Sequence, residues 1–220
     1  MDFAETEDQK MIRSMVREFS ETVAGPTCDK RDKEQISPIE EFKKFSELGF
    51  AGMTIPEEYG GQKLDDISEA IVVEELSRVD ASLGVMVAVH VGLCSMTIAL
   101  SGNEEQKKKY LPKLASGEFL GAYSLSEAGS GTDAAAMVAK ATDSGEHFTL
   151  NGEKMWVTNG TTADLFVLFA KVADHPDYGK KSHGGVTCFI IEKGFEGFEI
   201  GKKEDKLGIR SSDTCTLVLN

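Results

Sequence analysis

The sequence contains few of the residues from which metal sites and disulfide frameworks are built. Only four cysteines occur among its 220 residues, and no two of them form a C-x-x-C pair. The four histidines are equally dispersed, so the spacing predicts no metal site. We therefore expect Cys28, Cys94, Cys188 and Cys215 to be buried free thiols, as in proteins of a reducing compartment.

Basic residues are also scarce relative to acidic ones. The chain has 24 Lys and Arg against 37 Asp and Glu, a formal net charge of −13. Nucleic acids and anionic membranes need a basic face, so we expect neither as a partner. The first eight residues are acidic where a signal or transit peptide is basic, which favours a cytoplasmic location.

One uncharged run, residues 81–102, is long enough for a transmembrane helix. It nevertheless carries several hydroxyl residues, His90 and three glycines, and it lacks flanking basic residues and an aromatic belt. A helix that is apolar on every side also suits the centre of an all-helical domain. We adopt that interpretation and expect no membrane insertion.

The first half of the chain reads as helices. Capping-box patterns occur at Thr6-x-x-Gln9, Ser37-x-x-Glu40 and Asn103-x-x-Gln106, and apolar residues follow at helical spacing. The first helix is expected to end near Gly25-Pro26. These patterns predict an all-helical domain over residues 1–117.

From residue 118 the period changes to short alternating runs, which predict strands. Asn151-Gly152 is the strongest hairpin signal in the chain. We therefore expect an α+β protein, with an antiparallel β-barrel over residues 118–220 after the helical domain. The chain stops inside an expected strand, which predicts a fragment truncated at its C-terminal end. The expected strands cover 119–126, 137–142, 147–151, 153–158, 165–172, 186–192 and 214–219.

The densest cluster of small residues, hydroxyls and acids runs from Tyr123 to Asp133, Tyr-Ser-Leu-Ser-Glu-Ala-Gly-Ser-Gly-Thr-Asp. Backbone N–H groups in such a run can approach an anionic or polar ligand closely. A polar hairpin loop with no ligand is the alternative interpretation. The loop also matches the dinucleotide fingerprint G-x-G-x-x-A loosely, so a nicotinamide-binding unit competes, although the ten-residue segment Ala134–Asp143 is short for a crossover helix.

The only tryptophan lies in a second informative stretch, Lys154-Met-Trp-Val-Thr-Asn-Gly160. A tryptophan at a strand end can simply be a core or interface residue. If it shares a site with the Tyr123–Asp133 loop, the two together offer an aromatic surface, hydroxyls and free backbone amides. Such a site suits a flat polar heterocycle with a pyrophosphate tail.

These two stretches resemble the signatures of the acyl-CoA dehydrogenase family. The loop is similar to its [Ser/Thr]-Glu-x-x-x-Gly-[Ser/Thr]-Asp core, and residues 156–159 are similar to its Trp-[Ile/Val]-Thr-Asn segment. Residues 56–61, 74–77 and 102–106 agree as well, and residues 201–210 look most like the short-chain (butyryl) branch. Ala128 departs from the proline of many members.

The resemblance implies a helical N-terminal domain, a β-barrel middle domain and a C-terminal helical domain that this chain lacks. It implies FAD as the cofactor and a homo-oligomer, a dimer or tetramer, at full length. Thr132 would also touch the acyl-CoA substrate, with Ser182 and His183 at the CoA tail. The residues implied to line the flavin are Tyr123, Leu125, Ser126, Gly131, Thr132, Trp156, Val157 and Thr158.

The implied reaction belongs to fatty acid metabolism: α,β-dehydrogenation of an acyl-CoA to the 2-enoyl-CoA, with electrons passed to an electron-transferring flavoprotein. The family's catalytic base belongs to the C-terminal domain, so no residue here is expected to be catalytic, and Glu127 is interpreted as organising its loop. The isolated chain is expected to be inactive. A nicotinamide-dependent oxidoreductase and a non-catalytic binding or assembly fragment remain the alternatives.

Overall fold

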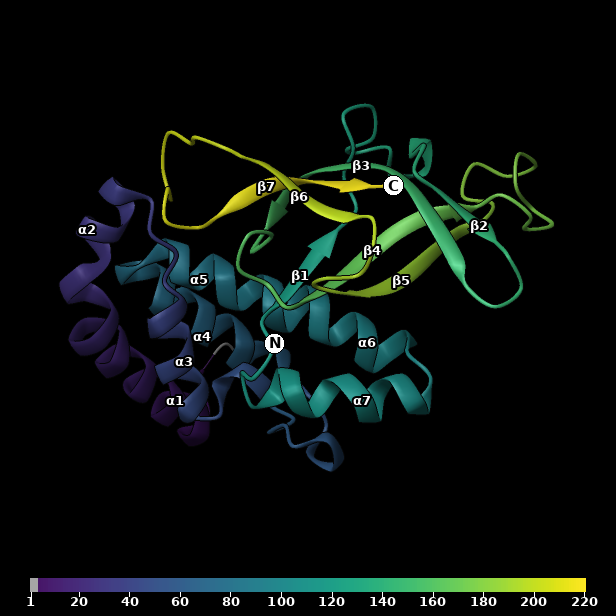
Figure 1. Cartoon of the computed structure of the whole chain (residues 1–220). Helices are drawn as coiled ribbons and strands as arrows, with labels where there is room; N and C mark the ends of the chain where they lie inside the picture. The colour runs from purple at the N-terminus through teal and green to yellow at the C-terminus, as the bar shows by residue number, and fades with distance from the viewer. Residues whose placement is uncertain (1–3) are drawn as a thin grey trace. The chain divides into compact units, whose positions relative to one another are not determined.

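The structure, a computed structural model, describes residues 4–220. It divides into two units (Figure 1). The helical unit holds the chain up to Leu120 together with the segment Asp205–Asp213, and the sheet unit holds Gly121–Glu204 and Thr214–Asn220. The late segment joins the helical unit through the backbone N–H of Arg210, which donates to Asp32 Oδ1 at 2.6 Å.

The helical unit is built of seven α-helices in its described part, connected by short turns and two π-helical segments. Phe42, Phe45, Leu76, Leu83 and Leu111 lie among its fully buried core residues. The helices are α1 (Glu7–Phe19), α2 (Gly25–Glu34), α3 (Ile39–Glu47), α4 (Asp66–Val79), α5 (Ala81–Ala88), α6 (Met96–Ser101) and α7 (Glu104–Ala115).

Helix α1 does not end at Gly25-Pro26, so that expectation is wrong. A π-helical segment, Ser20–Ala24, connects α1 directly to α2, and Pro26 lies in the first turn of α2. Proline is tolerated there because the N–H that it lacks needs no partner in a first turn. The π-helical segment passes directly into α2 without a break, so the chain stays helical to Glu34.

Two of the three expected capping boxes form. Thr6 and Gln9 cap α1 reciprocally, and Asn103 and Gln106 do the same for α7. The expected box at Ser37 is wrong, because α3 has Pro38 at its N-cap and makes no side-chain capping bond. A proline fixes its own φ near −65°, so it can start the helix without a cap from Ser37.

The uncharged run forms one helix, Ala81–Ser101, which by length and composition alone could cross a membrane. Half of its most apolar window is buried within the protein, as in the core helix of a helical domain. His90 lies in its π-helical segment, Val89–Ser95, with Nε2 3.1 Å from the Leu114 carbonyl. Complete burial lowers the pKa of His90 to about 4, so the ring is neutral at pH 7.

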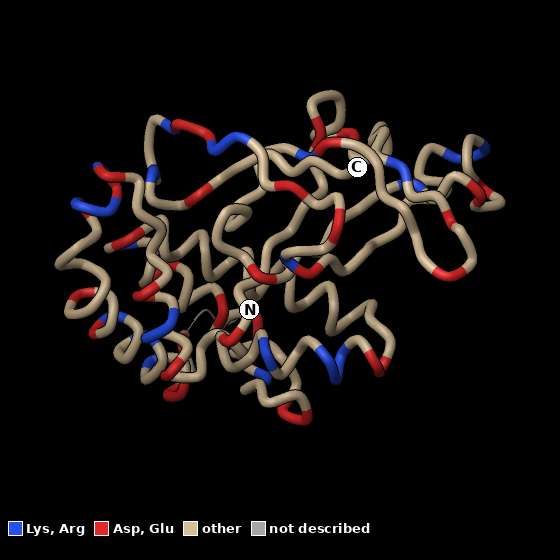
Figure 2. The backbone as a smooth tube through the Cα atoms, viewed as in Figure 1, with Lys and Arg blue, Asp and Glu red and all other residues tan. Residues whose placement is uncertain are grey.

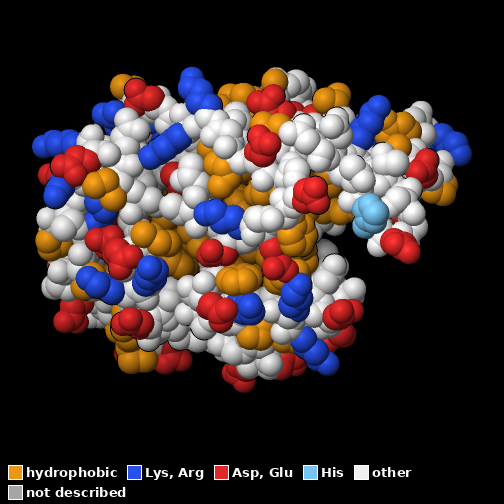
Figure 3. Space-filling view, viewed as in Figure 1, with side chains coloured by type: hydrophobic (Ala, Val, Ile, Leu, Met, Phe, Trp, Pro, Cys, Tyr) orange, Lys and Arg blue, Asp and Glu red, His pale blue; other side chains and the backbone are white. Residues whose placement is uncertain are grey.

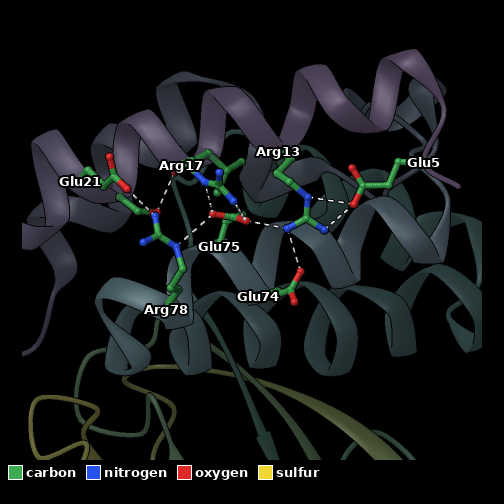
Figure 4. Close-up of polar contacts among 9 residues, drawn as sticks. Glu5, Arg13, Arg17, Glu21, Glu74, Glu75 and Arg78 are labelled. Atoms are coloured by element: carbon green, nitrogen blue, oxygen red, sulfur yellow. Dashed lines mark hydrogen bonds and ion pairs between the residues drawn. The ribbon is translucent and has the colours of Figure 1, made fainter. Parts of the chain in front are cut away.

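A buried carboxylate joins α1 to α4 (Figure 4). Glu75 is 2 % exposed at its side chain and lies 2.5 Å from Arg13 Nη1, 2.8 Å from Arg17 Nη2 and 3.3 Å from Arg78 Nε. Hydrogen bonds from Arg17 outweigh the effect of burial and, with those from Arg13 and Arg78, lower the pKa of Glu75 to about 2. Glu75 is therefore ionised at pH 7 and links α4 to α1 through its ion pairs with Arg13 and Arg17.

The sheet unit contains one mixed sheet with the order β1-β4-β2-β3-β7-β6, and β5 pairs with β4. β1 and β2 run parallel to β4, and the other strand pairs are antiparallel. The strands are β1 (Gly121–Ser124), β2 (Lys140–Asp143), β3 (Phe148–Thr158), β4 (Leu165–Val172), β5 (Val186–Glu192), β6 (Phe198–Lys203) and β7 (Thr214–Leu219).

The α+β class is confirmed, although within residues 4–220 the sheet is mixed and its strand order does not close into a ring. The expected hairpin at Asn151-Gly152 is wrong, since both residues lie inside β3 and pair with Lys140 and Leu219. Gly152 is needed for another reason. Its φ is +146°, and a Cβ there would lie 2.9 Å from Ala139.

The net acidity is distributed along the chain. Lys and Arg are scattered among Asp and Glu (Figure 2), and on the face drawn in Figure 3 charged side chains of both signs are interspersed with uncharged ones. All four cysteines are free thiols, but only Cys94 and Cys215 are buried, whereas Cys28 and Cys188 are half-buried. No cluster of metal-ligating side chains occurs in the part of the chain that the structure describes.

Candidate functional site

The site loop, residues 125–139, leaves β1 and returns at β2. Strand β5 pairs along β4 from Leu165 to Lys171, so β1 and β2 must share the opposite edge of β4. β1 takes the first four residues of that edge and β2 the last two. The chain between them is thereby forced out of the sheet, which is why a loop stands at this point.

A buried ion pair attaches the site loop to β3. Lys154 Nζ lies 2.7 Å from Glu127 Oε1 and donates to the Leu125 carbonyl at 2.9 Å. The side chains of Lys154 and Glu127 are 0 % and 4 % exposed. One residue along β3, the Met155 N–H donates to the Ser126 carbonyl at 2.9 Å. Adjacent residues of β3 therefore hold adjacent carbonyls of the loop.

Glu127 also organises the loop internally. Its carboxylate accepts from the N–H groups of Val138 at 2.6 Å and Ala139 at 3.1 Å, so it ties the two ends of the loop together. Its backbone exchanges two hydrogen bonds with Ser130 across a tight turn. Burial raises its pKa, but Lys154 and the two N–H groups outweigh it, and the pKa of Glu127 is lowered. The expectation that Glu127 organises its loop is confirmed.

Strand β3 carries an irregularity opposite the loop. Its pairing with β7 shifts register between Lys154 and Val157, and Trp156 has a φ of +57°. Tryptophan rarely adopts a positive φ, and bulges of this kind re-aim side chains. The indole is 62 % exposed, whereas Val157 is 1 % exposed. The bulge therefore presents a large aromatic surface to a ligand or another part of a protein.

The tip of the loop offers unpaired donors and open space. The N–H groups of Ser126, Gly131, Thr132 and Asp133 donate to no residue within 4–220. A Cβ built on Gly129 or Gly131 would meet nothing within 4 Å. Unpaired backbone N–H groups are the donors from which anion sites are built, so these amides are available to an anionic ligand.

The structure brings most of the predicted cofactor residues together. Tyr123 lies in β1 with its ring beside that of Phe169, the ring centroids 5.2 Å apart, while Leu125, Ser126, Gly131 and Thr132 follow in the loop. Trp156 lies in the β3 bulge, and Val157 and Thr158 follow it in the strand to which that loop is bonded.

Ser182 and His183 lie elsewhere in the sheet unit. Both are exposed residues of the connection between β4 and β5. Within residues 4–220, no hydrogen bond or ion pair joins either of them to the site loop. Their contact with the CoA tail stays a prediction.

Sequence reasoning missed the role of Lys154. Lysine is seldom fully buried, and nothing in the local pattern Glu-Lys-Met-Trp distinguishes this side chain from a solvated one. A signal was nevertheless present, because Glu127 is an acid in a loop of small residues and so requires a cation if it is buried.

The dinucleotide-fingerprint interpretation loses its structural basis. After Gly129-x-Gly131-x-x-Ala134 the chain makes a short 3₁₀ turn, Ala134–Ala136, and not a crossover helix. Its next strand, β2, pairs antiparallel with β3. The unpaired amides, the hydroxyls and the exposed indole instead suit a planar polar ring carrying a phosphate-bearing tail.

Comparison with protein families gives two matches in chain order. Residues 6–118 match the acyl-CoA dehydrogenase N-terminal domain, and residues 122–220 match the acyl-CoA dehydrogenase middle domain. A short-chain-specific acyl-CoA dehydrogenase of Clostridium acetobutylicum is 46 % identical over 218 residues, covering 99 % of this chain and 56 % of the relative. A mitochondrial isovaleryl-CoA dehydrogenase of Pongo abelii is 40 % identical over 217 residues, covering 97 % of this chain and 50 % of the relative.

Solved structures of acyl-CoA dehydrogenases are also similar to this chain. Butyryl-CoA dehydrogenase of Megasphaera elsdenii superposes with a TM-score of 0.90 at 38 % identity, covering 100 % of this chain and 57 % of that one. An acyl-CoA dehydrogenase of Bacillus anthracis, solved with FAD, has a TM-score of 0.88 at 38 % identity, covering 98 % of this chain and 36 % of that one. The chain spans about half the length of the curated relatives it matches.

The two domain matches together cover nearly the whole chain, in the order in which the helical unit and the sheet unit occur. The chain belongs to the acyl-CoA dehydrogenase family.

Proposed function

We propose that this chain supplies the N-terminal and middle domains of an FAD-dependent acyl-CoA dehydrogenase. In this proposal the domains cover residues 1–117 and 118–220. The observation that carries the proposal is the pair of bonds by which Lys154 and Met155 hold the site loop against the β3 bulge. That arrangement gathers the unpaired amides and the exposed indole on one small part of the sheet unit.

The residues fit the cofactor by their chemistry. Trp156 offers a planar apolar surface, Thr158 and Ser126 offer hydroxyls, and the amides of Gly131 and Thr132 suit a pyrophosphate. Bound FAD would supply the acceptor for the hydride that leaves the substrate β-carbon. The chain's own residues would bind the flavin, orient it and exclude water from one side.

The proposed reaction converts an acyl-CoA into the 2-enoyl-CoA. Its first requirement is a carboxylate base for the α-proton, which we assign to a C-terminal domain outside this sequence. Thr132 would contact the acyl-CoA at the loop, with Ser182 and His183 near the CoA tail. Electrons would pass to an electron-transferring flavoprotein, and the full-length enzyme would be a homo-oligomer.

We place the substrate in the short-chain class. Support comes from the short-chain-specific relative and from the superposed butyryl-CoA dehydrogenase. A structure described as the electron transferring flavoprotein of Acidaminococcus fermentans, with a TM-score of 0.93 at 44 % identity, supports the proposed electron acceptor. The free thiols of all four cysteines fit a cytoplasmic enzyme.

The test is the absorption spectrum and turnover of the purified full-length protein. We expect a yellow protein with one FAD per chain, flavin bands that bleach on addition of butyryl-CoA, and slower bleaching with long-chain acyl-CoA. The isolated 220-residue chain should bind FAD weakly and show no turnover. A colourless full-length protein that binds NADH, or one that binds neither cofactor, would contradict the proposal.

A further inference from the structure

We propose that Lys154 is a positioning residue that tunes the flavin without touching it, by polarising the peptide group between Leu125 and Ser126. The inference rests on the proposed function, because it concerns the same site. Two features carry it: the contacts of the Lys154 ammonium, and the unpaired N–H at the other end of that peptide group.

The ammonium is placed entirely inside the sheet unit. Its side chain is 0 % exposed, and its two bonds go to Glu127 Oε1 and to the Leu125 carbonyl. A buried charge acts in a low dielectric, so its influence on neighbouring dipoles is much larger than at a surface. Glu127 partly compensates this charge, so the field at the loop depends on both residues.

The Leu125 carbonyl and the Ser126 N–H are the two ends of one planar peptide group. A cation on the carbonyl oxygen draws electron density from the amide nitrogen, which makes the N–H a stronger donor. The Ser126 N–H has no acceptor among residues 4–220, and neither does its hydroxyl. Lys154 thus strengthens a donor that is left for a ligand.

The geometry of this peptide group is fixed as well as polarised. Lys154 donates to the Leu125 carbonyl of this peptide group at 2.9 Å. The Met155 N–H donates to the next carbonyl of the loop, that of Ser126, also at 2.9 Å. Lys154 and Met155 are successive residues of β3, immediately before Trp156 at the bulge. One strand therefore sets both the direction of the Ser126 donor and the aromatic surface beside it.

The proposal predicts opposite effects for the two partners of the ion pair. Reduced flavin carries more negative charge than oxidised flavin, so net positive charge near the donor favours reduction. Lys154→Met leaves Glu127 uncompensated and should lower the reduced-to-oxidised ratio at a fixed potential about tenfold, which is about 30 mV for a two-electron couple. Glu127→Gln leaves Lys154 uncompensated and should raise that ratio.

The experiment is spectroelectrochemical titration of the full-length flavoprotein and its variants. Lys154→Arg keeps the charge and should remain within about threefold of the wild type, since a charged bond to the carbonyl can reform. Lys140→Met, at an exposed lysine of β2, is the matched control and should leave the ratio unchanged.

A purely structural ion pair gives a different pattern. Lys154→Met and Glu127→Gln would then both weaken FAD binding and leave the potential unmoved or shifted in the same direction, which overturns the inference. If Lys154→Met does not fold, the sign of the shift in the near-isosteric Glu127→Gln decides alone. A full-length protein that binds no FAD overturns the proposed function itself, which is a separate outcome.

Discussion

Replacing Gly131 with leucine should weaken FAD binding to the full-length protein about 100-fold, with no change in the thermal stability of the apoprotein. Loss of two hydrogen bonds from backbone amides to a charged group costs about 3 kcal/mol, which corresponds to that factor. A leucine side chain at this position would fill the space above the unpaired N–H groups of Gly131 and Thr132. Isothermal titration of apoprotein with FAD measures the effect.

The fold itself should accept the leucine. Gly131 does not have a positive φ, and a Cβ there meets nothing within 4 Å. Gly208 shares both properties but lies in the segment that joins the helical unit, so Gly208→Leu is the matched control. Unchanged FAD affinity in Gly131→Leu, or equal losses in the two variants, would show that the loop tip does not bind the cofactor.

Replacing Glu75 with glutamine should lower the free energy of unfolding of the helical unit by about 3 kcal/mol at pH 7. The pKa of Glu75 is lowered from 4.5 to about 2, and each unit corresponds to about 1.4 kcal/mol. The variant leaves Arg13, Arg17 and Arg78 facing one another without the carboxylate that holds them. Urea unfolding followed by circular dichroism at 222 nm measures the difference.

The pH dependence provides a second check. A lowered pKa means that the carboxylate contributes its full stability above pH 4.5 and loses it as the pH falls towards 2. The wild type and Glu75→Gln should therefore converge near pH 2. Glu74→Gln is the control, because Glu74 is 66 % exposed and, within residues 4–220, pairs only with Arg13, so the loss of stability should be within about 0.5 kcal/mol. Equal losses in both variants at pH 7 would contradict this account.

Local patterns predicted the elements whose causes are local. The side-chain caps of α1 and α7 use residues three positions apart, and strands β4, β5 and β7 have the bounds that their own runs of β-branched, aromatic and other apolar residues predicted. Strand β6, Phe198–Lys203, went unpredicted, because its alternation is only four residues long, Phe-Glu-Ile-Gly, and its pairing depends on β7.

Where distant residues decide, sequence reasoning failed. Asn151-Gly152 has the composition of a turn, but pairing with β2 on one side and β7 on the other keeps it inside β3. The same limit applies to the site. The two family signatures located the loop and the bulge, while the bond between Lys154 and Leu125, 29 residues apart, appears only in the fold.

The most direct test of whether the site loop and the β3 bulge bind the cofactor is hydrogen–deuterium exchange of the full-length apoprotein with and without FAD. Exchange slows where an amide gains a hydrogen-bond acceptor or is shielded from water. We predict slower exchange in peptides covering residues 124–133 and 155–159, where the unpaired amides and the β3 bulge lie. Stoichiometric FAD binding with unchanged exchange in both peptides would contradict the assignment of this loop and bulge to the cofactor.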